Sequence, residues 1–113
     1  MQSKLLIPFI LLFTIFIAAC SQQAQQTQEK SFGDSVQIDN FEFSPSILYA
    51  SKGATITWTN NEGVSHQILF KNIDIEGEVL QKGDTFSFKF DNQGEYNYIC
   101  KIHPSMNGKI IVE

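Results

Sequence analysis

Residues 55–59 read TITWT, and residues 86–90 read FSFKF. In both stretches the large apolar side chains stand at every second position, so in an extended chain they lie on one face. β-Branched and aromatic residues of this kind are enriched in strands. The two stretches therefore predict β-strands with one apolar face each, and they set the fold class of the chain.

Short apolar or alternating runs recur on both sides of these stretches, with turn-forming residues between them. The further strands that we expect lie at residues 36–43, 47–50, 66–70, 96–100 and 109–112, with a short edge strand at 78–80 as the eighth. No window repeats with the period of a helix. Seven or eight short strands with turns about every 8–12 residues are typical of an all-β sandwich or barrel. Seven Phe, three Tyr and one Trp after residue 19 supply a large core.

The N-terminal residues predict an export signal. Residues 5–19 carry no charge, follow Lys4 and end in small side chains before Cys20. The run is shorter than the ~20 apolar residues that a membrane-spanning helix needs. A positive start, an apolar stretch and small residues are typical of a secretory signal peptide. We therefore expect residues 1–19 to be a signal peptide and the protein to be exported.

Cys20 stands where a lipid anchor would be attached. A cysteine behind small residues at the end of an apolar run resembles the bacterial lipobox, which implies that Cys20 is lipidated and becomes the mature N-terminus. The alternative is an ordinary signal with an incidental cysteine. Residues 20–34 are rich in Gln and poor in apolar side chains, which predicts a flexible tether. We expect the folded domain at residues 35–113, on a membrane-anchored lipoprotein that faces the periplasm or the cell exterior.

The charge of the expected mature chain argues against a nucleic-acid partner. Without residues 1–19 the chain has 94 residues, with seven Lys, no Arg and twelve acidic residues, hence a net charge of −5. Nucleic-acid-binding domains usually carry a basic patch. A domain of this size buries only roughly 60–70% of its unfolded surface. A bound metal or a membrane anchor would add to its stability.

Four side chains carry the chemistry. Residues 100–106 read CKIHPSM and contain Cys100, His103 and Met106, and His66 opens an expected strand earlier in the chain. A thiolate, two imidazoles and a thioether are the ligand set of blue copper sites. Thiolate and thioether favour Cu(I), and imidazole accepts Cu(II). A loop that follows a strand could wrap its three donors around one ion.

Other chemistries fit these residues less well. Covalent haem attachment needs two cysteines just before a histidine, and only Cys100 lies in the stretch that precedes His103. Zinc accepts Cys and His but gains little from a thioether. A Cys-His nucleophile needs the two side chains packed as thiol and base, and their spacing on one short loop beside Met fits a metal better. Four protein ligands leave no open position for a substrate, so we do not expect an enzyme.

Two stretches resemble the cupredoxins, and most closely the plastocyanin and amicyanin group. The first is YNYIC at 96–100 with His103, Pro104, Met106 and Gly108, and the second is TWTNNEGVSH at 57–66. The resemblance covers about residues 36–112. It implies an eight-stranded Greek-key sandwich that holds one copper ion and transfers one electron at a time. It also implies His66, Cys100 and His103 as equatorial ligands and Met106 as the axial ligand.

One residue departs from the family pattern. Cupredoxins usually have Asn after the first histidine ligand, and this chain has Gln67. The family Asn ties the ligand loops together, and its backbone N–H points at the thiolate. The Gln67 backbone N–H can also point at the thiolate. The longer Gln67 side chain changes the contact between the ligand loops, and with it the reduction potential of the copper.

The resemblance implies an exported, monomeric carrier of single electrons between redox proteins such as a cytochrome or a copper- or quinol-linked oxidoreductase. A copper-trafficking lipoprotein is the main alternative, and a surface domain with a vestigial site is the next. Family members dock partners at the apolar end, which predicts that Gly63, Val64 and Pro104 lie near His103. Four acidic residues also suggest a docking patch, although a solvated loop is the interpretation we favour; they are Glu62, Asp74, Glu76 and Glu78.

Overall fold

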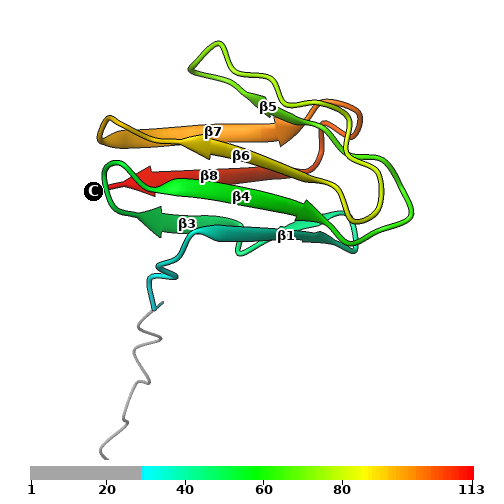
Figure 1. Ribbon diagram of the computed structural model, residues 1–113, viewed down its shortest axis with the longest axis horizontal. Coiled ribbons are helices and arrows are strands. Elements are labelled where there is room, and N and C mark those ends of the chain that lie inside the picture. The colour runs from blue at the N-terminus through cyan, green and yellow to red at the C-terminus, as the bar shows by residue number, and fades with distance from the viewer. Residues whose placement is uncertain (1–28) are drawn as a thin grey trace, which may run out of the picture.

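The computed structural model describes residues 29–113, which form two packed β-sheets (Figure 1). The eight strands of this region are β1 (Ser35–Asp39), β2 (Glu42–Ser44), β3 (Ile47–Ala50), β4 (Thr55–Asn60), β5 (Ile68–Phe70), β6 (Thr85–Lys89), β7 (Gly94–Cys100) and β8 (Asn107–Val112). The expectation of an all-β, eight-stranded sandwich is confirmed. Within residues 29–113 there is no helix with the length and apolar character needed to cross a membrane.

The sheet topology brings the loops after β4 and β7 to one end of the sandwich. One sheet has the order β2-β1-β4-β6 and the other has the order β3-β8-β7-β5. Strands β1 and β4 run parallel, as do β3 and β8, and the remaining neighbours are antiparallel. We call the end where β4 and β7 finish the ligand end, because the predicted ligands follow or close these two strands.

Aromatic rings fill the space between the two sheets. Trp58 on β4 is fully buried and meets Phe70 and Tyr98 of the opposite sheet edge to face, at centroid distances of 5.8 and 5.4 Å. Edge-to-face pairs at such distances add to the stability that burial provides. Two phenylalanines depart from the expected core: Phe32 is 61% exposed and Phe41 is 49% exposed.

The expected strand at residues 78–80 is wrong. In its place Leu80 forms a single antiparallel bridge with His66, through hydrogen bonds of 3.1 and 2.7 Å between their backbones. The strand expected from His66 onward begins only at Ile68. The physical reason is that the His66 backbone is taken up by Leu80, so it cannot join the β5–β7 ladder.

Candidate metal centre

Three of the four predicted ligands meet at the ligand end. His66, Cys100 and His103 each place a donor atom within 4.8 Å of the other two, and they are the one such group in the described part of the chain. The Cys100 Sγ lies 3.6 Å from His66 Nδ1 and 3.8 Å from His103 Nδ1. His66 and Cys100 are fully buried, whereas His103 is half-buried.

Backbone hydrogen bonds hold the loop that carries His103 and Met106. Cys100 ends β7, and its N–H donates to the Met106 carbonyl at 3.0 Å. The Met106 N–H in turn donates to the His103 carbonyl at 2.9 Å. Met106 itself is buried, at 4% exposure, at the end of this loop. The loop therefore closes on itself before β8 begins.

The donor set fits copper. Ligand atoms bonded to one ion at about 2.0–2.3 Å lie roughly 3–4 Å apart, and the sulfur-to-nitrogen distances here fall in that range. A thiolate with two imidazoles, and a thioether close by, matches the blue copper ligand set. Copper supplies one-electron redox chemistry when it is bound.

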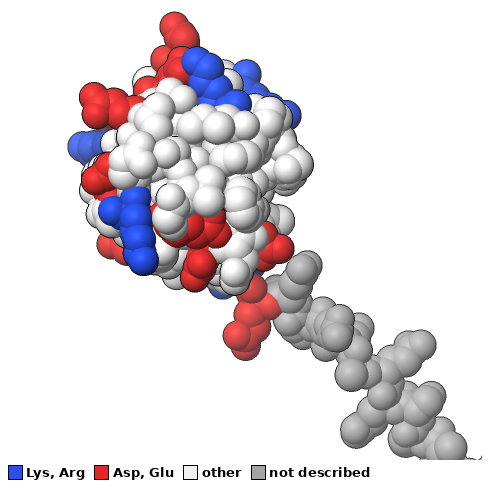
Figure 2. Space-filling view, turned by 90° about the vertical axis from the view of Figure 1, so that its right-hand side faces the viewer, with Lys and Arg blue, Asp and Glu red and all other residues white. Residues whose placement is uncertain are grey.

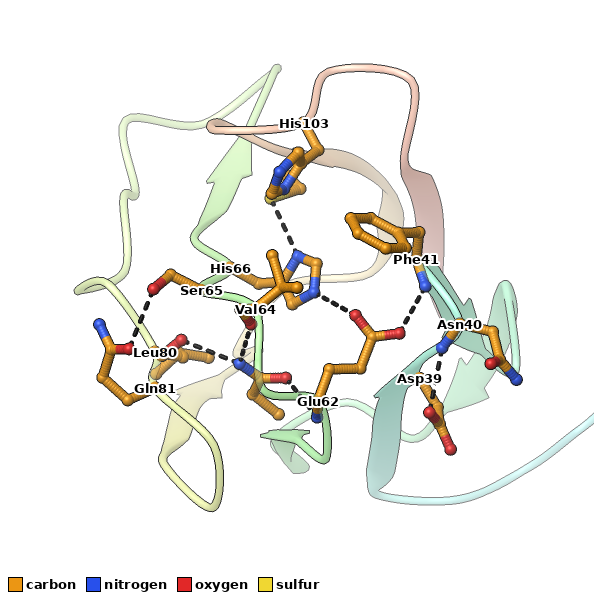
Figure 3. Close-up of polar contacts among 12 residues, drawn as sticks. Asp39, Asn40, Phe41, Glu62, Val64, Ser65, His66, Leu80, Gln81 and His103 are labelled. Atoms are coloured by element: carbon orange, nitrogen blue, oxygen red, sulfur yellow. Dashed lines mark hydrogen bonds and ion pairs between the residues drawn. The ribbon is translucent and has the colours of Figure 1, made fainter.

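Glu62 acts on the site in a way that the sequence did not predict. Its carboxylate was interpreted as solvated, yet the side chain is only 10% exposed and its Oε2 lies 2.7 Å from His66 Nε2 (Figure 3). The Phe41 backbone N–H donates to the other carboxylate oxygen at 2.6 Å. With Nε2–H donated to Glu62, the His66 Nδ1 lone pair is free for a metal. No sequence signal marks this contact, because a spacing of four residues brings side chains together on a helix and residues 61–65 form a loop.

The electrostatics of Glu62 favour its ionised form. Burial alone would raise the pKa of this carboxyl, but the hydrogen bonds from His66 and Phe41 outweigh it and hold the pKa below the ordinary value. A carboxylate on the outer nitrogen of a ligating histidine fixes the orientation of the ring and makes it a stronger ligand. Glu62 is thus part of the centre rather than of a docking patch.

The turn that carries Glu62 is held by a buried amide. Asn60 is fully buried, and its Nδ2 donates to the carbonyls of Val64 and Leu80 at 2.8 and 2.9 Å. Its Oδ1 accepts from the Glu62 N–H at 2.9 Å. All the hydrogen-bonding atoms of this amide therefore fix the loop that leads to His66.

Phe41 covers the centre from the side of the β1–β2 hairpin. Its ring meets the His66 and His103 rings edge to face, at centroid distances of 5.7 and 5.3 Å. Figure 3 shows the ring beside both imidazoles, with Val64 close to His66. Figure 2 faces the ligand end and shows an uncharged surface across much of it, with Lys, Asp and Glu side chains mainly around the margin. Phe41, Val64 and Ile102 are exposed apolar side chains of this end.

The family of this chain follows from comparison with known proteins. The model of the cupredoxin-like domain family matches residues 9–112. This chain belongs to that family. The match agrees with the sandwich and with the donor set, so we refer below to the cupredoxin domain of this chain.

Its relatives include amicyanins and plastocyanins. The cupredoxin chain is 35% identical over 107 residues to amicyanin-alpha of Methylorubrum extorquens, covering 89% of this chain and 90% of the relative. It is 33% identical over 84 residues to chloroplastic plastocyanin of Tetradesmus obliquus, covering 63% of this chain and 58% of the relative. A solved structure of an oxidised amicyanin variant superimposes with a TM-score of 0.67 at 31% identity, over 70% of this chain and 80% of that one.

Gln67 keeps one of the two contacts expected of the cupredoxin residue after the first histidine. Its backbone N–H points at Cys100 Sγ, 3.5 Å away. Its side chain instead donates from Nε2 to the Gly77 carbonyl at 2.9 Å and to Glu76 Oε1 at 3.0 Å. The longer side chain therefore reaches the loop that follows β5.

Proposed function

We propose that this cupredoxin is a type 1 blue copper protein that carries single electrons between redox proteins outside the cytoplasm. His66, Cys100, His103 and Met106 would hold the copper ion. The observation that carries the proposal is the buried Cys100 sulfur with an imidazole Nδ1 on either side of it, at 3.6 and 3.8 Å.

The chain holds its ligands in a way that suits rapid electron exchange. Cys100 belongs to a strand, His66 is bridged to Leu80, and the loop after Cys100 closes on itself by backbone hydrogen bonds. Ligands that are fixed by the fold move little when the metal changes charge, so the reorganisation energy stays small. The buried surroundings of Cys100 and His66 also keep water away from the centre.

The half-buried His103 is the proposed exit for the electron. It lies at the ligand end, beside the exposed apolar side chains of Phe41 and Ile102. An uncharged surface of this kind can pack against a redox protein such as a cytochrome or a copper- or quinol-linked oxidoreductase. The carrier does not itself transform a substrate.

A lipid on Cys20 would hold this carrier at a membrane. Cys20 and the expected signal and tether up to residue 28 lie outside the described residues. The position of residues 31–33 supports the arrangement, because they pair with Tyr49, which lies opposite Ile111 late in β8. The chain therefore enters the domain away from the ligand end (Figure 1), and an anchor there leaves the ligand end free.

A visible spectrum of the purified full chain with one equivalent of Cu(II) tests the function. We expect an intense blue charge-transfer band, because a copper–thiolate bond forms at Cys100. Cys100→Ser abolishes the band, whereas Cys20→Ser, which removes the other cysteine, retains it. A blue species that survives Cys100→Ser contradicts the assignment. Rapid transfer of Cu(I) to a mild chelator identifies a trafficking protein instead, and a folded chain that binds no copper identifies a vestigial site.

A further inference from the structure

We propose that Glu76 is a positioning residue that clasps the two ligand-bearing segments together through Gln67 and Lys101. We call these three side chains the Glu76 clasp. The effect of the clasp on the copper ligands rests on the proposed function. The contacts within the clasp join groups of the protein alone, so they exist without a bound metal. Each ligand segment contributes one member, because Gln67 follows His66 and Lys101 follows Cys100.

Two contacts join the segments directly beside the ligands, at the end of the β5–β7 ladder in which Ile68 is paired with Cys100. The Lys101 N–H donates to the Gln67 carbonyl at 2.8 Å, and the Gln67 N–H points at Cys100 Sγ at 3.5 Å. Any movement of one segment against the other would change both contacts and the distance between Cys100 and His66. The separation of the ligands thus depends on the β5–β7 pairing and, beyond the end of that ladder, on how firmly Gln67 and Lys101 are held.

The side chains of these residues converge on one carboxylate oxygen. Gln67 Nε2 donates to Glu76 Oε1 at 3.0 Å, and the Lys101 ammonium forms an ion pair with the same oxygen. The second hydrogen of the Gln67 amide goes to the Gly77 carbonyl. Both hydrogens of the amide are therefore used in joining the segments to the loop after β5.

The loop that presents Glu76 is itself fixed to the domain. The Gly77 N–H donates to the Ile68 carbonyl at 2.8 Å, and the Phe70 N–H donates to the Ile75 carbonyl at 3.1 Å. Gly77 is buried, and a methyl group added there would press on the Phe86 ring at 3.1 Å. The carboxylate is thus held from a rigid backbone, which is what a positioning residue requires.

The exposure of the clasp predicts its sensitivity to salt. The side chains of Glu76 and Lys101 are 43% and 50% exposed, so their attraction is partly screened by water and ions. Glu78 lies two residues away in the same loop, is exposed, and makes no hydrogen bond or ion pair through its carboxylate within residues 29–113. It is therefore a control of equal charge.

The first test measures amide hydrogen exchange in the copper-free full chain. We expect Glu76→Ala and Lys101→Met each to speed exchange of the Lys101 amide about fivefold, the upper range for an exposed ion pair. The double variant exchanges no faster than Glu76→Ala, because without the Glu76 carboxylate Lys101 has already lost its partner in the clasp. High salt speeds exchange in the unaltered chain and in Glu78→Ala, but not in Glu76→Ala. Unchanged exchange in Glu76→Ala overturns the proposal.

The second test measures the reduction potential of the copper-loaded chain. By charge alone, Glu76→Ala raises the potential and Lys101→Met lowers it. Loss of the clasp loosens the same two ligand segments, so we expect both variants to shift the potential in the same direction once the charge effect is removed. The shift of Glu78→Ala is subtracted from that of Glu76→Ala, and the shift of Lys71→Met, at an exposed lysine, is subtracted from that of Lys101→Met. Shifts of opposite sign, or faster exchange without a shift, overturn the positioning role. If the chain takes up no copper, the proposed function fails while the exchange test still decides whether the clasp exists.

Discussion

At the scale of single residues, His66 is oriented from both of its ring nitrogens. Nε2 faces the Glu62 carboxylate at 2.7 Å, and Nδ1 faces the Cys100 sulfur at 3.6 Å. A ring held in this way keeps one tautomer and one direction, so its metal-binding lone pair does not have to be reoriented when copper arrives. The carboxylate thus contributes to metal affinity without touching the metal.

Replacing Glu62 by Gln tests this contribution. Glu62→Gln keeps an acceptor oxygen for His66 but removes the negative charge, so the imidazole becomes a poorer ligand. We expect the affinity for Cu(II) to fall about tenfold, the lower range for residues that support a metal ligand. The measurement is a competition titration against a chelator of known affinity. Glu42→Gln makes the same charge change on an exposed side chain, and an equal loss in both variants would contradict the role of Glu62.

The lowered pKa of Glu62 predicts a pH dependence of stability. Folding favours the ionised carboxylate, so its contribution is present above the ordinary pKa of 4.5 and is lost as the pH falls through the lower value of the folded chain. We expect the copper-free chain to be more stable than Glu62→Gln at pH 6, with the difference shrinking below pH 4.5. Denaturant unfolding of both chains at several pH values measures it. A difference that grows on acidification would have the wrong sign.

At the scale of elements, the hairpin between β1 and β2 places Phe41 over the centre. Asn40 and Phe41 have φ values of 49° and 56°, and they connect Asp39 to its paired residue Glu42. Two such residues make a tight hairpin turn whose twist suits the flanking strands, although a bulky side chain rarely adopts this conformation. The strain is offset by the hydrogen bond from Phe41 to Glu62 and by the ring contacts with both imidazoles.

The pairing of β7 with β8 depends on a glycine. Gly108 lies opposite Tyr98, and an added Cβ would overlap the phenol ring. We expect Gly108→Ala to destabilise the fold by about 1–3 kcal/mol, because the buried ring has to move against the core. Denaturant unfolding measures the change. Gly63→Ala is the control, since nothing lies within 4 Å of its added Cβ, and equal stability of the two variants would contradict this packing.

At the scale of the whole molecule, the ligand end and the entry of the N-terminal segment lie apart. Phe41, Glu62 and His103 gather at one end, whereas Ser31 and Gly33 bond to Tyr49 in the part of the sandwich away from it. A carrier that is anchored through its N-terminus can therefore present its uncharged surface to a partner. The charged side chains around the margin of that surface would change the rate of association with a partner. They leave the uncharged surface itself open.

Loss of the anchor is the prediction at this scale. Cys20→Ser removes the sulfur that the lipobox resemblance expects to be lipidated, so we expect the protein to move from the membrane fraction to the soluble exported fraction if the signal is still processed. Fractionation followed by immunoblotting measures the distribution, and the visible spectrum checks that the copper site is retained. Equal membrane binding by the unaltered chain and the variant would argue that Cys20 carries no lipid.

The sequence predicted the strands better than the loops. The alternation of Ile56 with Trp58, and of Tyr98 with Cys100, is local and reports directly which face of a strand is buried. The contacts of the loops depend on how each loop folds and on segments distant in the chain, such as Phe41 beside Glu62. The local pattern therefore predicts a solvated Glu62 and a strand at residues 78–80, and the structure shows neither. The sequence also did not predict the turn at Phe41, because an aromatic residue in an alternating run gives no sign of a turn with positive φ.

Residue types and their local spacing determined that this chain is an all-β protein with sulfur and imidazole donors that suit copper. Alternation, turn residues and the short spacing from Cys100 to Met106 are properties of neighbouring residues, and they need no knowledge of the fold. The tertiary structure brings His66 to Cys100, as the family resemblance implied, and it alone decided that Glu62 turns inward and that Glu76 joins the two ligand segments. These contacts arise because the two sheets bring distant loops to one end of the sandwich, where distances between side chains depend on strand pairing.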